Sequence, residues 1–421
     1  MSVERWLTKV ASCRICGAPI EDFLAFGNMP LANELVDDRV AAEQQDRFPL
    51  TLAFCPRCSL VQLRETVAAQ RLFRDYVYMS STSASFVGHA AKLADRLVRE
   101  RALGRASRVI EIASNDGYLL QHYARRDIAV LGIEPARNIA QIAMNRGIET
   151  LPEFFSSALA RQLMAQDMAA DVVHLHNVLA HVSELTDVAA GVATLLKPEG
   201  LAVIEIPYLL DFLDRLEFDT VYHEHLCYFA LTPLLRLFEN VGLQVFDVER
   251  IPVHGGSLRI FVRRLRRQEA LPTVSALAEE ERRWGVGSIA TYQAFAEGVY
   301  AFRPILRNFL ADLRSKGHSI AAYGASAKGT TLVNYCAIGA DLIDFIADLS
   351  PLKQGRCLPG VGIPIFAPSE LAVRKPDYAV LLAWNFADEI VRQQADYVRL
   401  GGRFIVPLPR PVVLPAGSGM P

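Results

Sequence analysis

Apolar residues in the middle of the chain form short β-branched runs, and stretches with helical spacing separate these runs. Such alternation of buried strands with amphipathic helices is typical of a parallel sheet covered by helices. Two later apolar runs follow each other closely and are expected to add antiparallel strands at one edge. The pattern predicts parallel strands at 108–112, 130–133, 171–175 and 201–206, and antiparallel strands at 245–251 and 258–262.

The pattern changes on both sides of this central region. Before it, short strands are predicted at 48–54 and 60–63, and a helix at 85–102 leads into the sheet. After it, a long helical segment at 288–316 leads to a second α/β region, with strands at 319–323, 343–347, 378–382 and 403–406. We therefore expect domains at 1–75, 76–300 and 301–410, followed by a Pro- and Gly-rich disordered tail at 411–421.

Composition excludes some classes of function. The chain has 421 residues, 51% of them hydrophobic, so it can bury full cores. Its net charge of −2 gives no long-range attraction to nucleic acid or to an anionic membrane. No apolar run reaches transmembrane length, and the first residues lack the pattern of a signal peptide. We expect a soluble, cytoplasmic protein.

Four cysteines near the start form two Cys-x-x-Cys pairs. One pair could be a redox motif or chance, but two pairs can hold one zinc ion tetrahedrally. Four protein ligands leave no open position, so the zinc is expected to be structural. Residues 1–63 carry six basic and eight acidic side chains, the wrong sign for a nucleic-acid-binding zinc ribbon. The predicted ligands are Cys13, Cys16, Cys55 and Cys58; the other cysteines, Cys227, Cys336 and Cys357, are scattered and indicate a reducing compartment.

The first central strand runs into a loop, residues 113–117, that is suited to a nucleotide-type ligand. At such a turn, backbone donors and the helix that follows receive the ligand. The loop lacks Gly-x-Gly-x-x-Gly and carries crowded side chains, which favours S-adenosylmethionine over NAD. Glu134, at the end of the second strand, is expected to accept both ribose hydroxyls. An ordinary strand–helix turn with an exposed Asp116 is the alternative. The predicted cofactor-binding residues here are Glu111, Ala113, Asn115, Asp116, Gly117, Glu134 and Pro135.

Two further segments are candidates for the same edge of the sheet. Glu153, Phe154 and Phe155 could cover the adenine, although two core phenylalanines beside a surface glutamate would look the same. Asn177 follows the strand at 171–175 and is expected near both the cofactor and the substrate.

The segment Tyr222-His223-Glu224-His225 is the most unusual polar cluster in an apolar setting. It is not a zincin motif, because Cys227 stands where the second histidine would be needed. On an extended segment, His223 and His225 could face one pocket as a metal pair. A general base is the better interpretation, because the pKa of an imidazole suits proton removal near neutrality. Glu224 or a neighbour would orient its ring.

Other residues could complete this reaction centre. His181 follows the strand at 171–175, at the carboxyl edge of the sheet where ligands bind. Its alternative is a capping or surface histidine on a helix. Tyr76 and Tyr78 could close the pocket with their phenols, or could simply pack.

A loop of small residues, a lysine and hydroxyls follows the first strand of the carboxy-terminal region. Its lysine precedes glycine, so it is not a P-loop, but it suits a diphosphate at the start of a helix. A second, vestigial nucleotide fold is the alternative. The predicted substrate-binding residues are Ser326, Lys328 and Thr330, with Asn177 and the turn formed by His254, Ser257 and Arg259.

Five motifs occur in one order along the chain. They are Cys-x-x-Cys…Cys-x-x-Cys-x-Leu-Val-Gln-Leu, Glu-Ile-x-Ser-Asn-Asp-Gly, Tyr-His-Glu-His, His-Gly-Gly-Ser-Leu-Arg and Tyr-Gly-Ala-Ser-Ala-Lys-Gly-Thr-Thr. In this the chain resembles the three-domain deoxysugar C-methyltransferases of antibiotic and cell-surface sugar pathways. The resemblance covers all but about the last dozen residues. One departure is Ala113, where the family often has glycine.

The resemblance implies a zinc-binding module, a class I (Rossmann-like) methyltransferase domain and a second Rossmann-like α/β domain. It implies S-adenosylmethionine and structural zinc as cofactors, and a dTDP-linked 4-keto-deoxysugar as substrate of a monomeric, cytoplasmic enzyme. His225 would remove the C-3′ proton, and the resulting enolate would take the methyl group. The positions at which the family holds the ketone or tunes the base are Tyr76, His181, Tyr222 and Glu224.

Three other functions stay open at this point. The same fold could methylate C-5′ of a nucleotide sugar, or an oxygen or nitrogen of another small molecule. A zinc-ribbon scaffold or nucleic-acid-binding protein with an inactive methyltransferase domain is the third. The acidic ribbon and the intact Glu134 and His225 argue against that last class.

Overall fold

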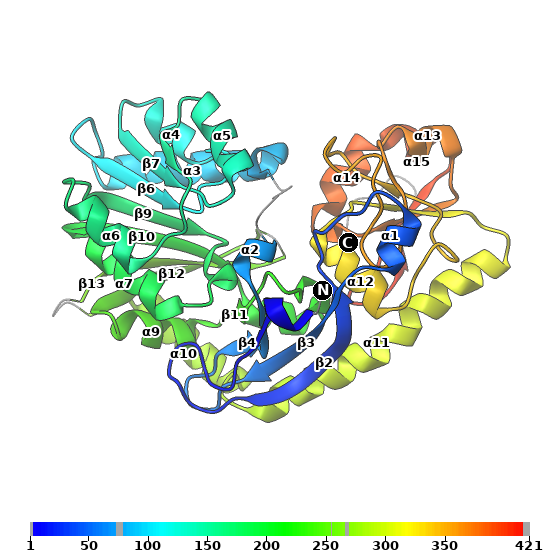
Figure 1. Ribbon diagram of the computed structural model, residues 1–421, viewed down its shortest axis with the longest axis horizontal. Helices are drawn as coiled ribbons and strands as arrows, with labels where there is room; N and C mark the ends of the chain where they lie inside the picture. The colour runs from blue at the N-terminus through cyan, green and yellow to red at the C-terminus, as the bar shows by residue number, and fades with distance from the viewer. Residues whose placement is uncertain (1–2, 73–78, 254, 266–268, 416–421) are drawn as a thin grey trace.

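The computed structural model describes residues 3–72, 79–253, 255–265 and 269–415. The central and carboxy-terminal domains lie side by side, and the amino-terminal domain lies between their lower ends (Figure 1). The predicted organisation, a zinc-type module followed by two α/β domains, is confirmed.

The central domain contains a seven-stranded sheet in its described part, with the strand order β12-β13-β10-β9-β6-β7-β8. The apolar runs that predicted parallel strands form the interior of the sheet, and β9 and β6 are buried on both faces. β13 is antiparallel to β10, and β12 is antiparallel to β13. The bounds are β6 Arg108–Ile112, β7 Ala129–Ile133, β8 Thr150–Leu151, β9 Ala170–His176, β10 Leu196–Pro207, β12 Leu243–Ile251 and β13 Ser257–Arg264.

Helices cover both faces of this sheet (Figure 1). In α3, Phe86, Ala90, Leu93 and Leu97 recur at helical spacing and form one buried stripe, and the Ser83 hydroxyl caps the first turn. The helices of the domain are α3 Ala84–Glu100, α4 Leu120–Ala124, α5 Arg137–Asn145, α6 Ser157–Met164, α7 Leu185–Leu195, α8 Leu209–Asp214, α9 Leu231–Glu239 and α10 Pro272–Trp284, with short 3₁₀ turns η2 Ser80–Thr82, η3 Leu179–His181 and η4 Phe218–Thr220.

The order in which strands join the sheet reverses between the neighbouring strands β6 and β9. From β6 the sheet is built outward through β7 and β8 on one side, and through β9 and β10 on the other. In open α/β sheets, ligands bind at the carboxyl ends of the strands at such a switch point. The loops that follow β6, β7 and β9 therefore meet at one edge.

The amino-terminal domain is built on a four-stranded antiparallel sheet, within the described ranges, of order β11-β4-β3-β2. The edge strand β11 does not come from this domain: it is Cys227–Tyr228, which immediately follows the predicted reaction segment. The other elements are η1 Val3–Trp6, β1 Leu7–Lys9, β2 Glu21–Pro30, α1 Arg39–Glu43, β3 Arg47–Phe54, β4 Val61–Leu63, β5 Glu65–Val67 and α2 Ala69–Leu72.

Helix α11, Ile289–Ser315, is the long helix that the sequence predicted, and it crosses to the carboxy-terminal domain beneath β2 (Figure 1). It leads to a sheet of order β16-β15-β14-β17-β18-β19. The elements are β14 Ile320–Tyr323, α12 Ala327–Tyr335, β15 Ile346–Ala347, β16 Ile365–Phe366, α13 Glu370–Arg374, β17 Tyr378–Leu381, η5 Trp384–Phe386, α14 Ala387–Gln393, α15 Ala395–Arg399, β18 Arg403–Val406 and β19 Val412–Val413.

One predicted feature of the chain's end differs from the structure. The sequence predicts a disordered tail from residue 411, but β19 pairs with β18 there and joins the last sheet. Residues 416–421 lie outside the described residues. Among the helices that the structure describes, none combines the length and the apolar character that crossing a membrane requires.

Candidate active site

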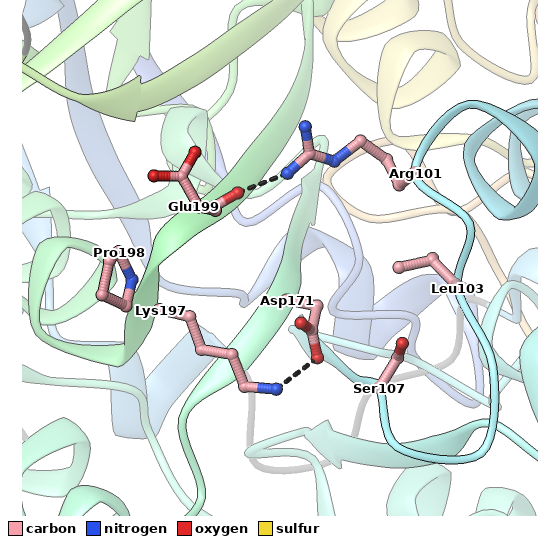
Figure 2. Close-up of a pocket in the computed structure, with 7 residues that line it drawn as sticks. All are labelled: Arg101, Leu103, Ser107, Asp171, Lys197, Pro198 and Glu199. Atoms are coloured by element: carbon pink, nitrogen blue, oxygen red, sulfur yellow. Dashed lines mark hydrogen bonds and ion pairs between the residues drawn. The ribbon is translucent and has the colours of Figure 1, made fainter.

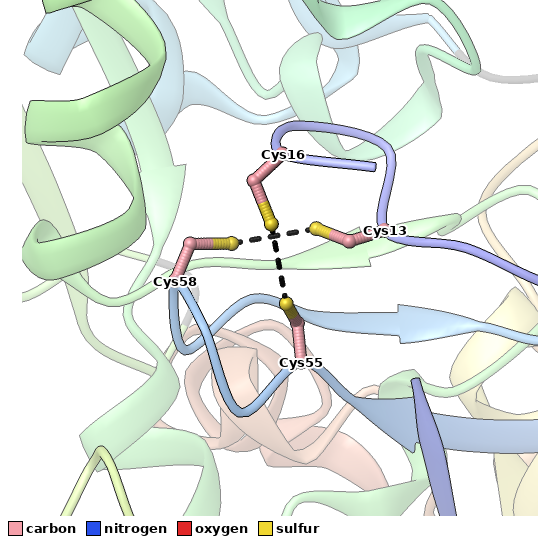
Figure 3. Close-up of side chains that lie close together, drawn as sticks. All are labelled: Cys13, Cys16, Cys55 and Cys58. Atoms are coloured by element: carbon pink, nitrogen blue, oxygen red, sulfur yellow. Dashed lines mark hydrogen bonds between the residues drawn. The ribbon is translucent and has the colours of Figure 1, made fainter. Parts of the chain in front are cut away.

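The four predicted zinc ligands come together in the amino-terminal domain (Figure 3). Their sulfur atoms lie within 4.8 Å of one another, and the pairs Cys13–Cys58 and Cys16–Cys55 are 3.3 and 3.5 Å apart. A tetrahedral zinc with Zn–S bonds of about 2.3 Å needs sulfur atoms about 3.8 Å apart, so the four thiols fit this metal. In each Cys-x-x-Cys motif the residue after the second cysteine is left-handed and closes the turn; these residues are Gly17 and Ser59.

The zinc site is tied to its surroundings through Gln62, which is fully buried in β4. Its side-chain oxygen accepts from the backbone nitrogen of Arg14 at 2.9 Å, within the first cysteine pair. Its nitrogen donates to the carbonyl of Ser12 at 3.3 Å. On the other side of β4, Gln62 pairs in register with Cys227 of β11. The metal site is therefore continuous with the strand that borders the reaction segment.

The loop after β6 adopts a conformation that few sequences tolerate. Ala113, Asn115 and Gly117 all have positive φ, at 53°, 49° and 79°. A Cβ at Gly117 would lie 2.9 Å from Ile148, so only glycine fits there. The loop turns tightly at the switch point, as predicted for the cofactor site.

Two buried carboxyl groups face each other across this edge. Glu134, 5% exposed, accepts from the backbone nitrogens of Asn115 at 3.0 Å and Ala136 at 2.9 Å. Burial raises the pKa of Glu134, and these two amides oppose the rise. Burial, with Asp116, Glu134 and Glu205 nearby, raises the pKa of Glu111 well above its usual value.

One oxygen of Glu111 is buried and has no hydrogen-bond partner among the described residues. An orphaned acceptor at the end of the first strand suits a ligand that brings a donor, such as the ammonium group of S-adenosylmethionine. The residues present thus fit this cofactor, and the assignment of Glu111 and Glu134 to it stays a prediction.

Replacing Ala113 by glycine should stabilise the protein slightly. A left-handed alanine costs the folded protein about 1–2 kcal/mol. Glycine removes this cost but raises the entropy of the unfolded chain, so we expect a net gain in stability of about 0.5–1 kcal/mol. Denaturant unfolding of Ala113→Gly measures the change, and calorimetry should show undiminished cofactor binding. Ala102, exposed and also left-handed at φ 49°, offers a matched control far from the site. A clear loss of cofactor affinity in Ala113→Gly alone would contradict the expectation.

The structure places the other predicted cofactor residues less uniformly. Asp116 is buried and turns away from the sheet edge to pair with Arg146 at 2.9 Å and with the Ser81 hydroxyl, so it is not the exposed residue of an ordinary turn. Phe154 is 52% exposed. The other residues are Pro135, half-buried; Glu153, exposed; Phe155, half-buried against Gly191; and Asn177, left-handed directly after β9.

The reaction segment crosses the carboxyl ends of β9 and β10. The nitrogen of Leu226 donates to the carbonyl of Ala180 in η3 at 2.6 Å, and the nitrogen of Leu209 donates to the carbonyl of Phe229 at 2.9 Å. These bonds hold the segment against the turns that leave both strands. His225 and the cofactor loop therefore lie at the same edge of the central sheet.

The hydrogen bonds of His225 define its tautomer. Its Nδ1 lies 3.0 Å from the backbone carbonyl of Thr220, which can only accept, so Nδ1 carries the hydrogen. Its Nε2 lies 2.7 Å from the hydroxyl of Tyr222 and is then the acceptor. A half-buried imidazole with a fixed Nδ1–H and a lone pair on Nε2 is arranged as a general base. The carbonyl of Thr220, rather than Glu224, is the group seen to orient the ring.

The neighbouring histidines have different surroundings. The ring of His181 lies 4.8 Å from that of His225, nearly perpendicular to it, and burial lowers the pKa of His181 to about 4. His223 points the other way, with Nε2 3.1 Å from the carbonyl of Pro49 in β3. The segment is not extended, so His223 and His225 do not share a pocket. Among the described residues, the cysteine cluster is the metal-type group.

Glu224 is 3% exposed, and its carboxylate accepts from the side-chain amide of Asn33 at 2.7 Å. Burial raises the pKa of Glu224 to about 7, and this hydrogen bond opposes the rise. The contact with Asn33 was not foreseen from the sequence. Its local signal was a polar pair, Asn33 and Glu34, within the otherwise apolar stretch Met29 to Leu35.

Lys328 lies in the first turn of α12, the helix that packs against η4 of the central domain. Its ammonium nitrogen is 4.6 Å from the ring centre of Trp384, and it has no hydrogen-bond partner in the part of the chain that the structure describes. Two buried carboxyl groups, those of Glu217 and Asp219, lie nearby; burial raises the pKa of each, and the charge of Lys328 opposes this rise. Ser326 caps α12, where it accepts from Gly329, whereas Thr330 donates to the carbonyl of Ala32 in the amino-terminal domain.

The remaining predicted substrate residues give a mixed result. Arg259 is 8% exposed and lies opposite Glu205 of β10, which it contacts at 2.7 Å; it also contacts Glu249 at 2.9 Å. Its guanidinium thus serves pairing between strands, an arrangement that depends on the strand register. Ser257 is buried and donates to the carbonyl of Val253. Tyr76, Tyr78 and His254 lie outside the described residues.

A surface pocket of about 400 Å³ lies at the opposite end of the sheet, near the amino ends of β6, β9 and β10 (Figure 2). In this pocket Lys197 contacts Asp171 at 2.7 Å, and Arg101 donates to the backbone carbonyl of Glu199. It is therefore distinct from the edge that carries the predicted cofactor and base residues.

Comparison with known proteins agrees with this layout. Families described as "Putative zinc binding domain", "Methyltransferase domain" and "C-methyltransferase C-terminal domain" match residues 13–73, 86–248 and 252–409. The C-methyltransferase NovU of Streptomyces niveus is 38% identical over 411 residues, which cover 97% of this chain and 98% of that protein. The chain belongs to the C-methyltransferase family.

Two other proteins are similar to part of this C-methyltransferase. A ubiquinone biosynthesis O-methyltransferase of Burkholderia pseudomallei is 26% identical over 164 residues, which cover 35% of this chain and 68% of that protein. The structure of magnesium protoporphyrin IX methyltransferase from Synechocystis, with bound S-adenosylmethionine, covers 46% of this chain and 88% of its own at 14% identity and a TM-score of 0.34. The predicted enzyme class and cofactors, S-adenosylmethionine and zinc, are confirmed.

Proposed function

We propose that this enzyme methylates C-3′ of a dTDP-linked 4-keto-deoxysugar, with His225 as the base. The observation that supports the proposal is the pair of contacts of half-buried His225, with Nδ1 held by the carbonyl of Thr220 and Nε2 facing the hydroxyl of Tyr222. Methylation at carbon needs a carbanion equivalent, and a ketone beside the reacting carbon supplies the required acidity. The family's carbon-methylating activity calls for such a base.

In the proposed reaction, Nε2 of His225 takes the C-3′ proton. The electron pair of the broken C–H bond moves toward the C-4′ carbonyl and forms an enolate. When bound, S-adenosylmethionine would supply the electrophilic methyl group; C-3′ would form its new bond to that carbon, the methyl–sulfur bond would break, and the C-4′ carbonyl would re-form. The carbonyl of Thr220 holds the Nδ1 hydrogen throughout, so the positive charge that develops on the ring is stabilised in place.

Tyr222 has a second part in this proposal. In the free enzyme its hydroxyl donates to Nε2 of His225 at 2.7 Å, so that hydrogen must turn away before Nε2 can accept a proton from carbon. A keto oxygen of the substrate would take this hydrogen bond and become polarised. One well-placed donor to a developing oxyanion contributes about 3–4 kcal/mol.

The carboxy-terminal domain is proposed to bind the nucleotide. Lys328 presents an ammonium group without a hydrogen-bond partner among the described residues, beside the indole ring of Trp384. A diphosphate would satisfy its donors. The expected substrate is therefore a nucleotide sugar. The enzyme would act in the cytoplasm, in the biosynthesis of unusual deoxysugars such as those of antibiotic pathways.

Incubation with ¹³C-methyl-labelled S-adenosylmethionine and a panel of dTDP- and GDP-linked 4-keto sugars tests the proposal. We expect a labelled methyl group on a new quaternary C-3′ carbon in the NMR spectrum of the product. Label on C-5′, oxygen or nitrogen would overturn the assignment. In D₂O without cofactor, the same sugar should exchange its C-3′ hydrogen for deuterium, and His225→Asn should abolish this exchange.

A further inference from the structure

The amino-terminal domain reaches into the reaction segment through one side chain. Asn33 lies in the loop after β2, and its amide nitrogen donates to a carboxylate oxygen of Glu224 at 2.7 Å, across 191 residues of sequence. Glu224 is one residue before His225 and is 3% exposed. A domain whose sequence suggests only a structural metal therefore contacts the buried carboxylate of the catalytic segment.

The loop that carries Asn33 is held from several directions. The Thr330 hydroxyl of α12 donates to the carbonyl of Ala32 at 2.9 Å, and the Gln45 side chain donates to the carbonyl of Glu34 at 2.7 Å. Arg71 of α2 forms an ion pair with Glu34. The neighbours of Asn33 are thus fixed by the amino-terminal and carboxy-terminal domains together, which sets the position of its amide.

Among the described residues, Asn33 is the hydrogen-bond partner of the Glu224 carboxylate. His223 turns its ring to Pro49, and His225 uses its ring nitrogens on Thr220 and Tyr222. His181 bonds to the backbone of Glu224 rather than to its side chain, and no charged group of the described chain contributes to the pKa of Glu224. The ionised form of this carboxylate thus depends on a single amide.

We propose that Asn33 is a positioning residue of the methyl-transfer reaction, which holds the Glu224 carboxylate in place within the catalytic segment. The inference rests on the proposed function, in which His225 of that segment is the base. It assigns the amino-terminal domain a part in the active site in addition to its own metal-dependent folding.

The direction of the pH effect follows from the contact. Burial raises the pKa of Glu224 to about 7, and the Asn33 hydrogen bond lowers it. Without this donor the pKa rises further, so a higher pH is needed to ionise the carboxylate. Asn33→Ala should therefore shift the acidic limb of kcat upward by about one pH unit, and Asn33→Asp, which adds a neighbouring negative charge, by more. Asn33→Gln keeps the donor and should restore part of the loss.

Two measurements test this inference on the full-length zinc protein. Infrared titration follows the protonated carboxyl band that Glu224→Gln removes, and it needs no substrate. The pH profile of kcat is then measured with the 4-keto sugar that gives product. Asn28, exposed in β2 of the same domain, supplies the control Asn28→Ala, which should leave both readouts unchanged. Zinc content and melting temperature should be the same in all variants.

The expected result is a higher infrared midpoint and a matching shift of the kcat profile in Asn33→Ala, with activity regained at high pH. An unchanged midpoint, or a loss of kcat that is equal at every pH, overturns the inference. Failure of the proposed function is seen separately, as full activity or C-3′ exchange in His225→Asn. In that case a shifted midpoint still supports the contact between Asn33 and Glu224, but its role in catalysis through this base is overturned.

Discussion

His225→Asn should bind S-adenosylmethionine as the natural enzyme does and lose about 10³-fold in kcat. The side-chain amide of asparagine can replace Nδ1 as the donor toward the carbonyl of Thr220, so the segment should retain its shape. It cannot take a proton at neutral pH, and a positioned general base typically contributes about 10²–10⁴-fold. Calorimetry of cofactor binding and single-turnover methylation measure the two quantities.

His318→Asn is a suitable control, because His318 lies in the carboxy-terminal domain near Asp377 and far along the chain from the reaction segment. It should keep both properties. Wild-type turnover in His225→Asn would show that the base is another group. A loss of cofactor affinity would instead show that His225 supports the cofactor edge of the sheet.

Loss of the metal should have the second large effect. One zinc per chain is expected by elemental analysis, and Cys13→Ser should yield insoluble protein rather than a slow enzyme. Zinc sites with four cysteine ligands contribute on the order of 10 kcal/mol to the folding of small zinc domains, comparable with the whole stability of a typical domain. Cys13 is 4% exposed and lies 3.3 Å from Cys58, so a serine there removes one of four converging ligands.

Cys357→Ser provides the matched substitution, since Cys357 is a buried cysteine outside the cluster. It should remain soluble and bind one zinc. A soluble Cys13→Ser protein with full zinc content would contradict the assignment of this ligand. Soluble protein that has lost zinc but keeps activity would show that the metal is dispensable for the fold.

Local patterns predicted the parts of this protein that local physics determines. Buried parallel strands read as continuous apolar runs, so β6, β7, β9 and β10 were located within a few residues. The paired cysteines and the loop at 113–117 carried their chemistry in short motifs. Because the carboxyl ends of parallel strands meet at one edge, Glu111, Glu134 and His181 could be expected at that edge before the fold was known.

Contacts made by backbone groups and contacts between distant segments could not be predicted in this way. The carbonyl of Thr220 orients His225, but a backbone group leaves no trace in the sequence. The pairing of Arg259 with Glu205 depends on strand register, which the short motif around Arg259 does not reveal. Thr330 reaches back to Ala32 across 298 residues, and Asn33 to Glu224 across 191. The last two contacts depend on how the three domains pack together.

Strand β11 has a consequence for how the protein is made. The amino-terminal domain emerges from the ribosome before the central domain and can bind zinc once Cys58 is available, but one edge of β4 lacks its partner β11 until Cys227 and Tyr228 have been synthesised. An unpaired strand edge invites pairing with another chain. His225 lies two residues before that missing strand, so the nascent enzyme gains its base and closes its exposed edge in the same step of synthesis.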